Sequence, residues 1–332
     1  MTGSFEVAVA ADTDALEALA PSWWRLWRCC PEATPFTSPA WLLPWWHAFA
    51  PGPLRVVAVR RAGQLAALAP LYLEDGAFGR RLLPLGIGLS DGFDLLVDPD
   101  LPEAGPALAE AVGRLPGWDS LHLEELPEGA AALSLRWPAG FADEVTGQSA
   151  RPVLDLPPGE SAVPAPQRRK LRMARHRAAR RGGRVEPVPP DATDSFLCDL
   201  VRLHGARWSA RGEAGVLADP RVRAFHAEAL PRLVEAGLAR LWRAVIADQV
   251  AGCFYGLQHG EVAYAYLGGF DPGFAFESPG TMLIGEAIEA AARDGATQFD
   301  FLRGQEAYKY GWGATDRLNR LRVVRRLDGA GG

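Results

Sequence analysis

Three pieces of sequence in the second half of the chain decide the fold class: Tyr264-Ala-Tyr-Leu-Gly-Gly-Phe-Asp-Pro272, Ser278-Pro-Gly-Thr-Met-Leu-Ile-Gly-Glu286 and Phe299-Asp-Phe-Leu-Arg-Gly-Gln-Glu-Ala-Tyr-Lys-Tyr-Gly-Trp312. The first predicts a strand that ends at its paired glycines. The second predicts a helix, because Ser is a common N-cap residue and Pro is favoured at the first helical position. The third predicts a short strand that ends at Asp300. Strand, helix and strand in this order indicate an α/β fold.

The start of the predicted helix is a candidate anion site. The first backbone N–H groups of a helix lack partners within it, and the helix dipole favours negative charge there. Gly280, between Ser278 and Thr281, would let a phosphate approach the main chain. An ordinary capped helix is the structural alternative.

Polar residues follow the strand that ends at Asp300, namely Arg303, Glu306, Tyr308 and Lys309. Strand ends are where ligands gather in open α/β sheets. The apolar neighbours in the same segment argue against a purely solvated surface. A buried ion pair, Asp300 with Arg303 or Arg303 with Glu306, is the alternative to a catalytic role.

The composition is that of a globular protein with more than one domain. The chain has 332 residues, of which 48% are hydrophobic and 23% charged, with a formal net charge of −5. A domain usually has ~100–200 residues, so two are expected. There is no apolar run of membrane-spanning length and no signal-peptide pattern. The four cysteines lack C-x-x-C or Cys/His spacing, so we expect a reducing, cytoplasmic location and no structural metal.

The average charge hides a basic segment. Residues 168–184 hold nine Arg or Lys and no acid, which leaves 26 basic against 40 acidic residues elsewhere. A helix over 168–181 has three interpretations: a solvated helix that covers the domain seam, a surface that attracts a phosphate-bearing donor such as coenzyme A or tRNA, or a membrane-surface helix. The third is disfavoured, because only Leu171 and Met173 interrupt the charge.

Periodicity and turn residues predict the remaining elements of the second half. Strands are expected at 184–188, 239–247, 250–258, 262–268, 297–301 and 318–327, and helices at 193–211, 220–235 and 278–293. Asp219 is the expected cap of the second of these helices, with Pro220 first in it and Gly237 after its end. The order is β-α-α-β-β-β-α-β-α-β, with a further short helix between the strands at 297–301 and 318–327.

The first half repeats this order more loosely. Strands are expected at 5–9, 54–60, 64–73 and 120–123, and helices at 13–29, 39–49 and 101–114. We therefore expect domains at 1–156 and 184–328, joined by a linker and the basic helix at 157–183. The repeated order suggests a duplication.

The chain resembles a known family along most of its length, most strongly after residue 195. The matching pieces are Leu203-His-Gly-Ala-Arg-Trp208, Gly268-Gly-Phe-Asp271, Ser278-Pro-Gly-Thr281 and Asp300-Phe-Leu-Arg-Gly-Gln-Glu-Ala-Tyr-Lys309, with weaker agreement at Phe36-Thr-Ser-Pro-Ala-Trp41, Ala69-Pro-Leu71 and Leu89-Ser-Asp-Gly-Phe-Asp94. They are similar to the BioF-like, or CelD/BcsL-type, acetyltransferase domain of the GNAT superfamily. The resemblance implies a tandem GNAT-like fold, as in the Fem-type aminoacyl transferases.

The resemblance implies an N-acyltransferase that moves an acyl group from acyl-CoA to an amine by direct attack. Asp300 or Glu306 would accept the amine proton, and Tyr308 or Tyr310 would protonate the leaving thiolate. Two splayed strands, near 264–267 and 298–301, would hold the donor arm. The residues implied in donor binding are Leu267 and Gly268, whose backbone N–H would stabilise the oxyanion, with Ser278, Gly280, Thr281, Arg303 and Lys309. For Lys309 a solvent-facing position is the alternative.

The acceptor is implied to meet both domains. Ser90, Asp91 and Asp94 would face it across the domain interface, and Arg207 and Trp208 would line the same cleft. A polar turn is the alternative for the first three, and a core position for Trp208. The acceptor, a small molecule or a peptide, and the oligomeric state are not readable from the chain.

The usual GNAT pyrophosphate loop, Q/R-x-x-G-x-G/A, is absent from the sequence after the strand at 262–268. An acyl carrier or an aminoacyl-tRNA therefore stays open as the donor beside acyl-CoA. The alternatives to a CoA-dependent enzyme are a Fem-type aminoacyl-tRNA-dependent transferase and a GNAT-like scaffold without catalysis.

Overall fold

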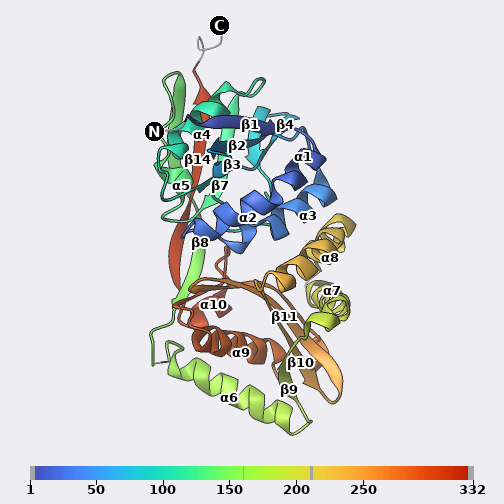
Figure 1. The fold of residues 1–332 in the computed structure, drawn as a ribbon. Helices are drawn as coiled ribbons and strands as arrows, with labels where there is room; N and C mark the ends of the chain where they lie inside the picture. The colour runs from blue at the N-terminus through green and yellow to red at the C-terminus, as the bar shows by residue number, and fades with distance from the viewer. Residues whose placement is uncertain (1–3, 160, 210–211, 328–332) are drawn as a thin grey trace. The chain divides into compact units, whose positions relative to one another are not determined.

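The computed structural model describes residues 4–159, 161–209 and 212–327 (Figure 1). Its elements form two compact units, the first made of Met1–Ser149 with Leu318–Gly332 and the second of Ala150–Arg317. This division differs from the expected boundaries, because the last strand belongs mostly to the first unit and the basic helix belongs to the second. Two long strands, β8 (Phe141–Asp155) and β14 (Thr315–Arg326), have residues in both units.

The second unit is built on a mixed sheet. The strand order is β8-β13-β12-β11-β10-β9. The strands are β9 (Arg184–Pro187), β10 (Ala239–Ile246), β11 (Gln249–His259), β12 (Val262–Phe270) and β13 (Gln298–Asp300). All neighbours pair antiparallel except β12 and β13, which are parallel. The strands expected at 184–188, 239–247, 250–258, 262–268 and 297–301 are confirmed to within two residues at each end.

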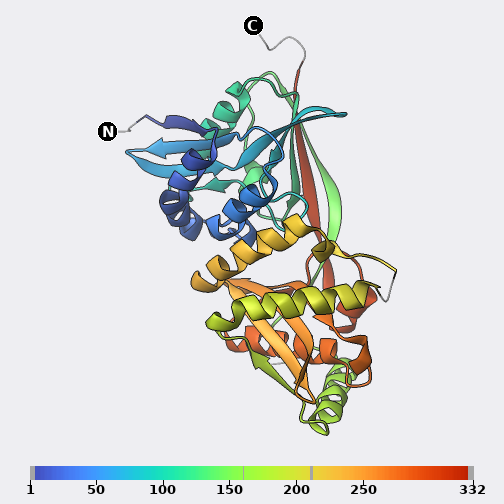
Figure 2. The ribbon, with the colours of Figure 1, turned by 90° about the vertical axis from the view of Figure 1, so that its right-hand side faces the viewer.

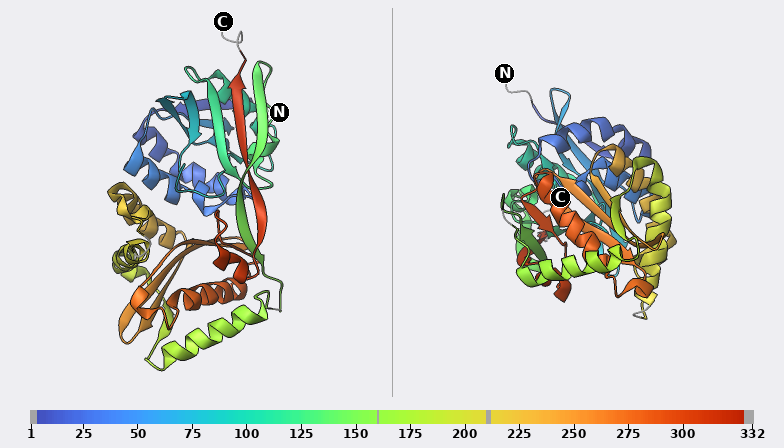
Figure 3. Two further views of the ribbon diagram at one scale, coloured as in Figure 1. Left: turned by 180° about the vertical axis from the view of Figure 1, so that it is seen from behind. Right: turned by 90° about the horizontal axis from the view of Figure 1, so that it is seen from below.

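Helices cover both faces of this sheet. They are α6 (Ala165–Ala179), α7 (Thr193–Ser209), α8 (Pro220–Glu235), α9 (Pro279–Arg293) and the short α10 (Ala307–Gly311). Figure 2 shows α7 and α8 side by side, and Figure 3 shows α9 on the opposite face with α6 beyond it. Asp219 caps α8 by accepting the Arg221 N–H, as predicted. The helix expected at 193–211 is α7, and its predicted last residue, Arg211, lies outside the described residues.

Two glycines allow the helices to approach the sheet closely. A Cβ on Gly269 of β12 would lie 2.4 Å from the backbone nitrogen of His204 in α7. A Cβ on Gly252 of β11 would lie 2.9 Å from the Leu283 side chain in α9. Gly269 pairs with Cys253, the neighbour of Gly252, so the two glycines face opposite sides of the sheet. The register thus sets α7 and α9 on opposite faces.

The first unit contains two sheets. One has the order β1-β2-β3-β6 and the other includes β4-β5-β7-β14, with β5 and β7 parallel. The strands are β1 (Glu6–Ala10), β2 (Val56–Arg61), β3 (Gln64–Ala69), β4 (Leu71–Gly76), β5 (Gly79–Pro84), β6 (Leu96–Val97) and β7 (Ser120–Leu126). The helices are α1 (Thr13–Ala18), α2 (Ala20–Cys29), α3 (Pro39–Phe49), α4 (Ala104–Arg114) and α5 (Ala131–Ser134). A parallel pair followed by an antiparallel strand thus occurs in both units.

Sequence patterns predicted the first unit less well, and proline accounts for two of the differences. The helix expected at 13–29 is interrupted at Leu19, because Pro21 starts a new helix at α2. The strand expected at 64–73 is divided at Pro70, which cannot donate to a strand ladder. Strands β5 and β8 were not predicted, and in β8 the segment Phe141–Gly147 is almost entirely exposed and has no regular apolar pattern.

No helix in the described part of the chain combines the length and the apolar character needed to cross a membrane.

Candidate active site

The parallel strands β12 and β13 pair over only three residues and then diverge. The paired residues are Val262 with Gln298, Ala263 with Phe299 and Tyr264 with Asp300. Beyond Tyr264, β12 continues to Phe270 and pairs with β11 alone among the described strands. One edge of β12 after Tyr264 therefore faces no strand. This matches the splayed pair expected near 264–267 and 298–301.

A β-bulge in β12 lies where the strands separate. Tyr255 of β11 pairs with Leu267 and Gly256 pairs with Ala265, so Tyr266 is the extra residue of the bulge. A bulge bends its strand and increases the local twist. Gly256 is required at this point, because a Cβ there would lie 3.0 Å from the Tyr264 carbonyl oxygen. The bulge gives a physical reason for β12 to turn away from β13.

Helix α9 begins close to the free end of β12. Its cap residue Ser278 is left-handed, with φ +57°, and its hydroxyl donates to the Ala275 carbonyl at 3.2 Å. Ser278 therefore occupies the cap position without capping through its side chain, which corrects the expectation. A Cβ on Gly280 would lie 3.4 Å from the Phe270 ring, so the helix start and the end of β12 are neighbours.

The basic segment adds charge at this helix start. Arg177 of α6 donates to the Phe276 carbonyl at 3.1 Å and stacks over its ring at 4.4 Å. Arg181 pairs with Glu277 at 2.9 Å. The hydrogen bond from Arg181 holds the pKa of Glu277 below its usual value. Two guanidinium groups thus lie beside the segment that leads into α9.

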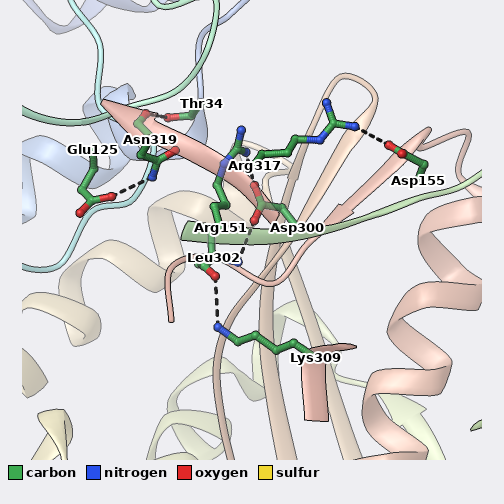
Figure 4. Close-up of polar contacts among 10 residues, drawn as sticks. Thr34, Glu125, Arg151, Asp155, Asp300, Leu302, Lys309, Arg317 and Asn319 are labelled. Carbon is green, nitrogen blue, oxygen red and sulfur yellow. Dashed lines mark hydrogen bonds and ion pairs between the residues drawn. The ribbon is translucent and has the colours of Figure 1, made fainter. Parts of the chain in front are cut away.

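Asp300 is a buried structural centre at the end of β13. Its oxygens are held by Arg151 of β8 and by the Leu302 N–H at 2.7 Å (Figure 4). Burial raises the pKa of Asp300, and Arg151 beside it opposes that rise. With a side chain only 1% exposed, Asp300 offers no accessible oxygen to a substrate. Its ion-pair partner Arg151 was not among the partners considered from sequence.

Lys309 holds the loop that follows. Its ammonium donates to the carbonyl oxygens of Leu302, Arg303 and Gly304 at 3.1, 2.8 and 2.9 Å (Figure 4 shows the first). It also pairs with Glu306 at 2.9 Å, and its side chain is 3% exposed. The solvent-facing alternative for Lys309 is therefore wrong, because the loop carbonyls surround the ammonium, and its contact with the donor stays a prediction.

The loop presents two other predicted residues at its surface. Glu306 is 57% exposed and Tyr308 43% exposed. Burial acts to raise the pKa of Glu306, but the Lys309 ammonium, a backbone hydrogen bond and the charge of Arg207 together outweigh it, so the pKa lies below its ordinary value. The Tyr310 hydroxyl donates to Asp316 at 2.8 Å. Tyr310 is thus held by Asp316, while the proton-donor role of either tyrosine stays a prediction. Arg303 is half-buried in the same loop.

Arg207 of α7 lies at the free end of β12. Its guanidinium donates to the Gly268 carbonyl at 3.4 Å and lies 5.3 Å from the centre of the Phe270 ring. Trp208 is half-buried and packs on His204, with ring centres 5.8 Å apart. Burial lowers the pKa of His204 to about 4. The structure thus brings Arg207 to the predicted donor strand at Gly268.

The predicted acceptor residues of the first unit are all buried. The Ser90 hydroxyl accepts a hydrogen bond from the Trp41 indole N–H at 2.9 Å. Asp94 accepts the backbone N–H groups of Leu95, Ala131 and Ala132 at 2.7–2.8 Å, so it caps the short helix α5. Asp91 is 6% exposed.

Sequence reasoning missed Arg151. It lies on β8, far from Asp300 in the chain, and no local motif marks it. An aspartate buried at a strand end needs a cationic partner, and this was the signal for a nearby basic residue. Only the pairing of β8 with β13 identifies that residue as Arg151.

Comparisons with known proteins concern one domain and the fold of the chain. Residues 165–310 match the family model of the acetyltransferase (GNAT) domain. A search of curated proteins found no significant match. Among solved structures, FemX is similar with a TM-score of 0.64 at 14% identity, covering 96% of each chain.

Two further solved structures are similar in fold. The C-terminal domain of a putative lysylphosphatidylglycerol synthetase from Agrobacterium fabrum has a TM-score of 0.58 at 12% identity and covers 92% of each chain. L-PGS from Bacillus licheniformis has a TM-score of 0.53 at 13% identity and covers 80% of this chain and 82% of its own. At these identities the likeness shows the fold.

The matched domain and the repeated architecture define a tandem GNAT-like fold with a GNAT-type acetyltransferase domain in its second unit. The protein is an enzyme of the N-acyltransferase class.

Proposed function

We propose that the protein moves an acyl group from acyl-CoA to the amine of an acceptor by direct attack in a ternary complex. The observation that carries this proposal is the divergence of β12 and β13 beyond Tyr264, next to the start of α9. The resemblance to the BioF-like, CelD/BcsL-type acetyltransferases supports this acyl transfer. Membership of that family is part of the proposal.

The donor would bind along the free edge of β12. An extended chain can add to such an edge through backbone hydrogen bonds. The start of α9, at Gly280 and Thr281, would receive the donor phosphates, with Arg177 beside it. Arg303 is a further candidate for donor contact. A backbone N–H near Leu267 and Gly268 would stabilise the oxyanion.

In the reaction, the amine nitrogen forms a bond to the thioester carbonyl carbon and the carbon–sulfur bond breaks. After attack the nitrogen is strongly acidic, so a carboxylate with a low pKa can take its proton directly or through water. Glu306 is the exposed carboxylate of the loop and would fill this role, while Tyr308 would protonate the thiolate. Asp300 would act as a positioning residue, through its hold on Leu302.

Calorimetric titration with acetyl-CoA and longer acyl-CoAs tests the donor. Thr281→Asp would place a carboxylate at the start of α9 and should weaken binding ~10-fold, a loss of ~1.4 kcal/mol. Ala292→Asp, exposed in the last turn of the same helix, adds the same charge and should leave affinity unchanged. If no acyl-CoA binds the wild-type protein, the proposal is wrong.

An aminoacyl-tRNA donor is the second candidate, and the surface of α6 favours it. Arg169, Arg172, His176 and Arg180 are exposed at helical spacing on one side of α6. Arg175, in contrast, is paired with Glu286 and Glu289 of α9 at 3.2 and 2.6 Å. The exposed row is a candidate contact for a phosphate backbone.

This candidate predicts tRNA binding that weakens steeply with salt. The triple change of Arg169, Arg172 and Arg180 to Ala should reduce the salt slope and the affinity. Arg175→Ala is the matched control, because its charge is already balanced. If tRNA binding does not depend on salt, or if both variants change the affinity for tRNA equally, the aminoacyl-tRNA donor is excluded.

A further inference from the structure

The first unit contains a cavity of about 490 Å³ that no step of the proposed reaction uses. It lies between the end of α2, the segment 94–99, the start of α4 and the helix α5. All of its lining residues belong to the first unit. Sites for small organic ligands typically measure ~300–1,000 Å³ and combine an apolar lining with a few polar groups.

The charges of the cavity are unbalanced. Of the described residues that line it, three carry carboxylates, Glu32, Asp94 and Asp98, and one carries a cation, Arg136. The rest of the lining is mainly apolar and includes Leu135. An excess of carboxylate in an otherwise apolar cavity favours a cationic ligand, because buried negative charge is costly without a partner.

Asp94 is the buried member of this group. Its side chain receives three backbone N–H groups, while the residue is 3% exposed. Asp94 is among the residues that line the cavity, and three hydrogen bonds leave one of the about four acceptor positions of a carboxylate. Burial, with a smaller contribution from the nearby Glu32, raises the pKa of Asp94 to about 7 although the three backbone hydrogen bonds act to lower it. A bound cation would relieve both effects.

We propose that this cavity binds a small organic molecule that carries an ammonium group on a short apolar body. The ammonium would lie among the carboxylates of Glu32, Asp94 and Asp98. The apolar body would pack against the aliphatic lining beside Leu135. An amine acceptor of the proposed reaction and a separate amine effector share this chemistry.

Calorimetric titration with n-pentylamine at pH 8, without any acyl donor, tests the site. Its neutral and anionic analogues, 1-pentanol and pentanoate, have the same apolar body. The amine should bind ~10-fold more tightly than either, as expected for one charge-assisted hydrogen bond. Equal binding of pentanol or pentanoate would overturn the proposal.

Variants locate the binding. Glu32→Gln and Asp98→Asn should each weaken amine binding severalfold, and Ser134→Trp should block the cavity and abolish it. Glu128→Gln, exposed and outside the lining, is the matched control and should have no effect. Amine binding that survives both Ser134→Trp and Glu32→Gln would also overturn the proposal.

Adding acetyl-CoA then distinguishes whether the bound amine is the acceptor of the reaction or a separate effector. If N-acetylpentylamine forms and Ser134→Trp stops its formation, the cavity holds the acceptor. If the amine binds without being consumed, the cavity holds an effector. Because binding is measured without a donor, failure of the acyl-CoA proposal leaves this test intact.

Discussion

Arg151 of β8 and Asp300 of β13 form an ion pair in the interior of the second unit, with side chains 14% and 1% exposed. The same carboxylate receives the N–H of Leu302, which is left-handed with φ +60°. A non-glycine residue adopts this conformation only when its surroundings hold it. The pair therefore sets the start of the loop that presents Glu306 and Tyr308.

Arg151→Gln should destabilise the protein by ~3–5 kcal/mol, because it leaves the Asp300 charge buried without a partner. Arg317→Gln is the matched control. It removes an arginine from a pair with Asp155 that is 38% and 64% exposed, so it should cost less than ~1 kcal/mol. Urea denaturation measures both. Equal midpoints for the two variants would contradict the structural role of Arg151.

The two lysines of the chain should respond to the same change to very different degrees. Lys309→Met leaves three loop carbonyls without their donor and should cost ~2–4 kcal/mol. Lys170→Met alters an exposed position on α6 and should change stability by less than ~0.5 kcal/mol. Denaturant titration of both variants measures the difference, and a wild-type midpoint for Lys309→Met would refute the contacts described.

Gly269→Ala should destabilise the second unit by ~1–3 kcal/mol, because the added methyl group would push α7 away from β12. Gly205→Ala places the same methyl group in open space within α7 and should stabilise the helix by up to ~1 kcal/mol. Thermal unfolding of the two variants should therefore shift in opposite directions. Shifts of the same sign would show that the α7–β12 contact is looser than described.

Tyr308→Phe should lower kcat at least ~10-fold if Tyr308 protonates the leaving thiolate. Tyr310→Phe should have little effect on kcat, because its hydroxyl is engaged by Asp316. Steady-state kinetics with a fixed acyl-CoA and amine compares them, and the pH profile should lose its basic limb only in Tyr308→Phe. If Tyr310→Phe lowers kcat more than Tyr308→Phe does, Tyr310 is the residue that protonates the thiolate.

Asp94 should make stability depend on pH. Its folded pKa of about 7 lies above the ordinary value of 3.8, so the folded state binds the proton more tightly. Its stabilising contribution is fully present below pH ~3.8 and is lost as the pH rises through ~7. Asp94→Asn should remove a decline of at most ~1.4 kcal/mol per pH unit between pH 4 and 7. Identical pH profiles of unfolding for wild type and variant would contradict the burial of Asp94.

Local signals determined the order of elements in the second unit. Asp219 and Pro220 start α8, and the alternating runs that become β10, β11 and β12 need no distant partner to be recognised. The same signals placed Asp300 at a strand end and Glu306 in the loop after it. In the first unit, Pro21 and Pro70 divide elements that apolar periodicity alone had joined.

Tertiary structure alone decided what these residues do. Asp300 meets Arg151 across 149 positions of sequence, and Lys309 is enclosed by carbonyls that only the left-handed turn at Leu302 brings together. The cavity of the first unit is likewise assembled from α2, the segment 94–99, α4 and α5. The sequence by itself determined the elements, because helix and strand signals act over a few residues. The buried charges, the bulge at Tyr266 and the cavity depend on which elements become neighbours, which only the folded chain decides.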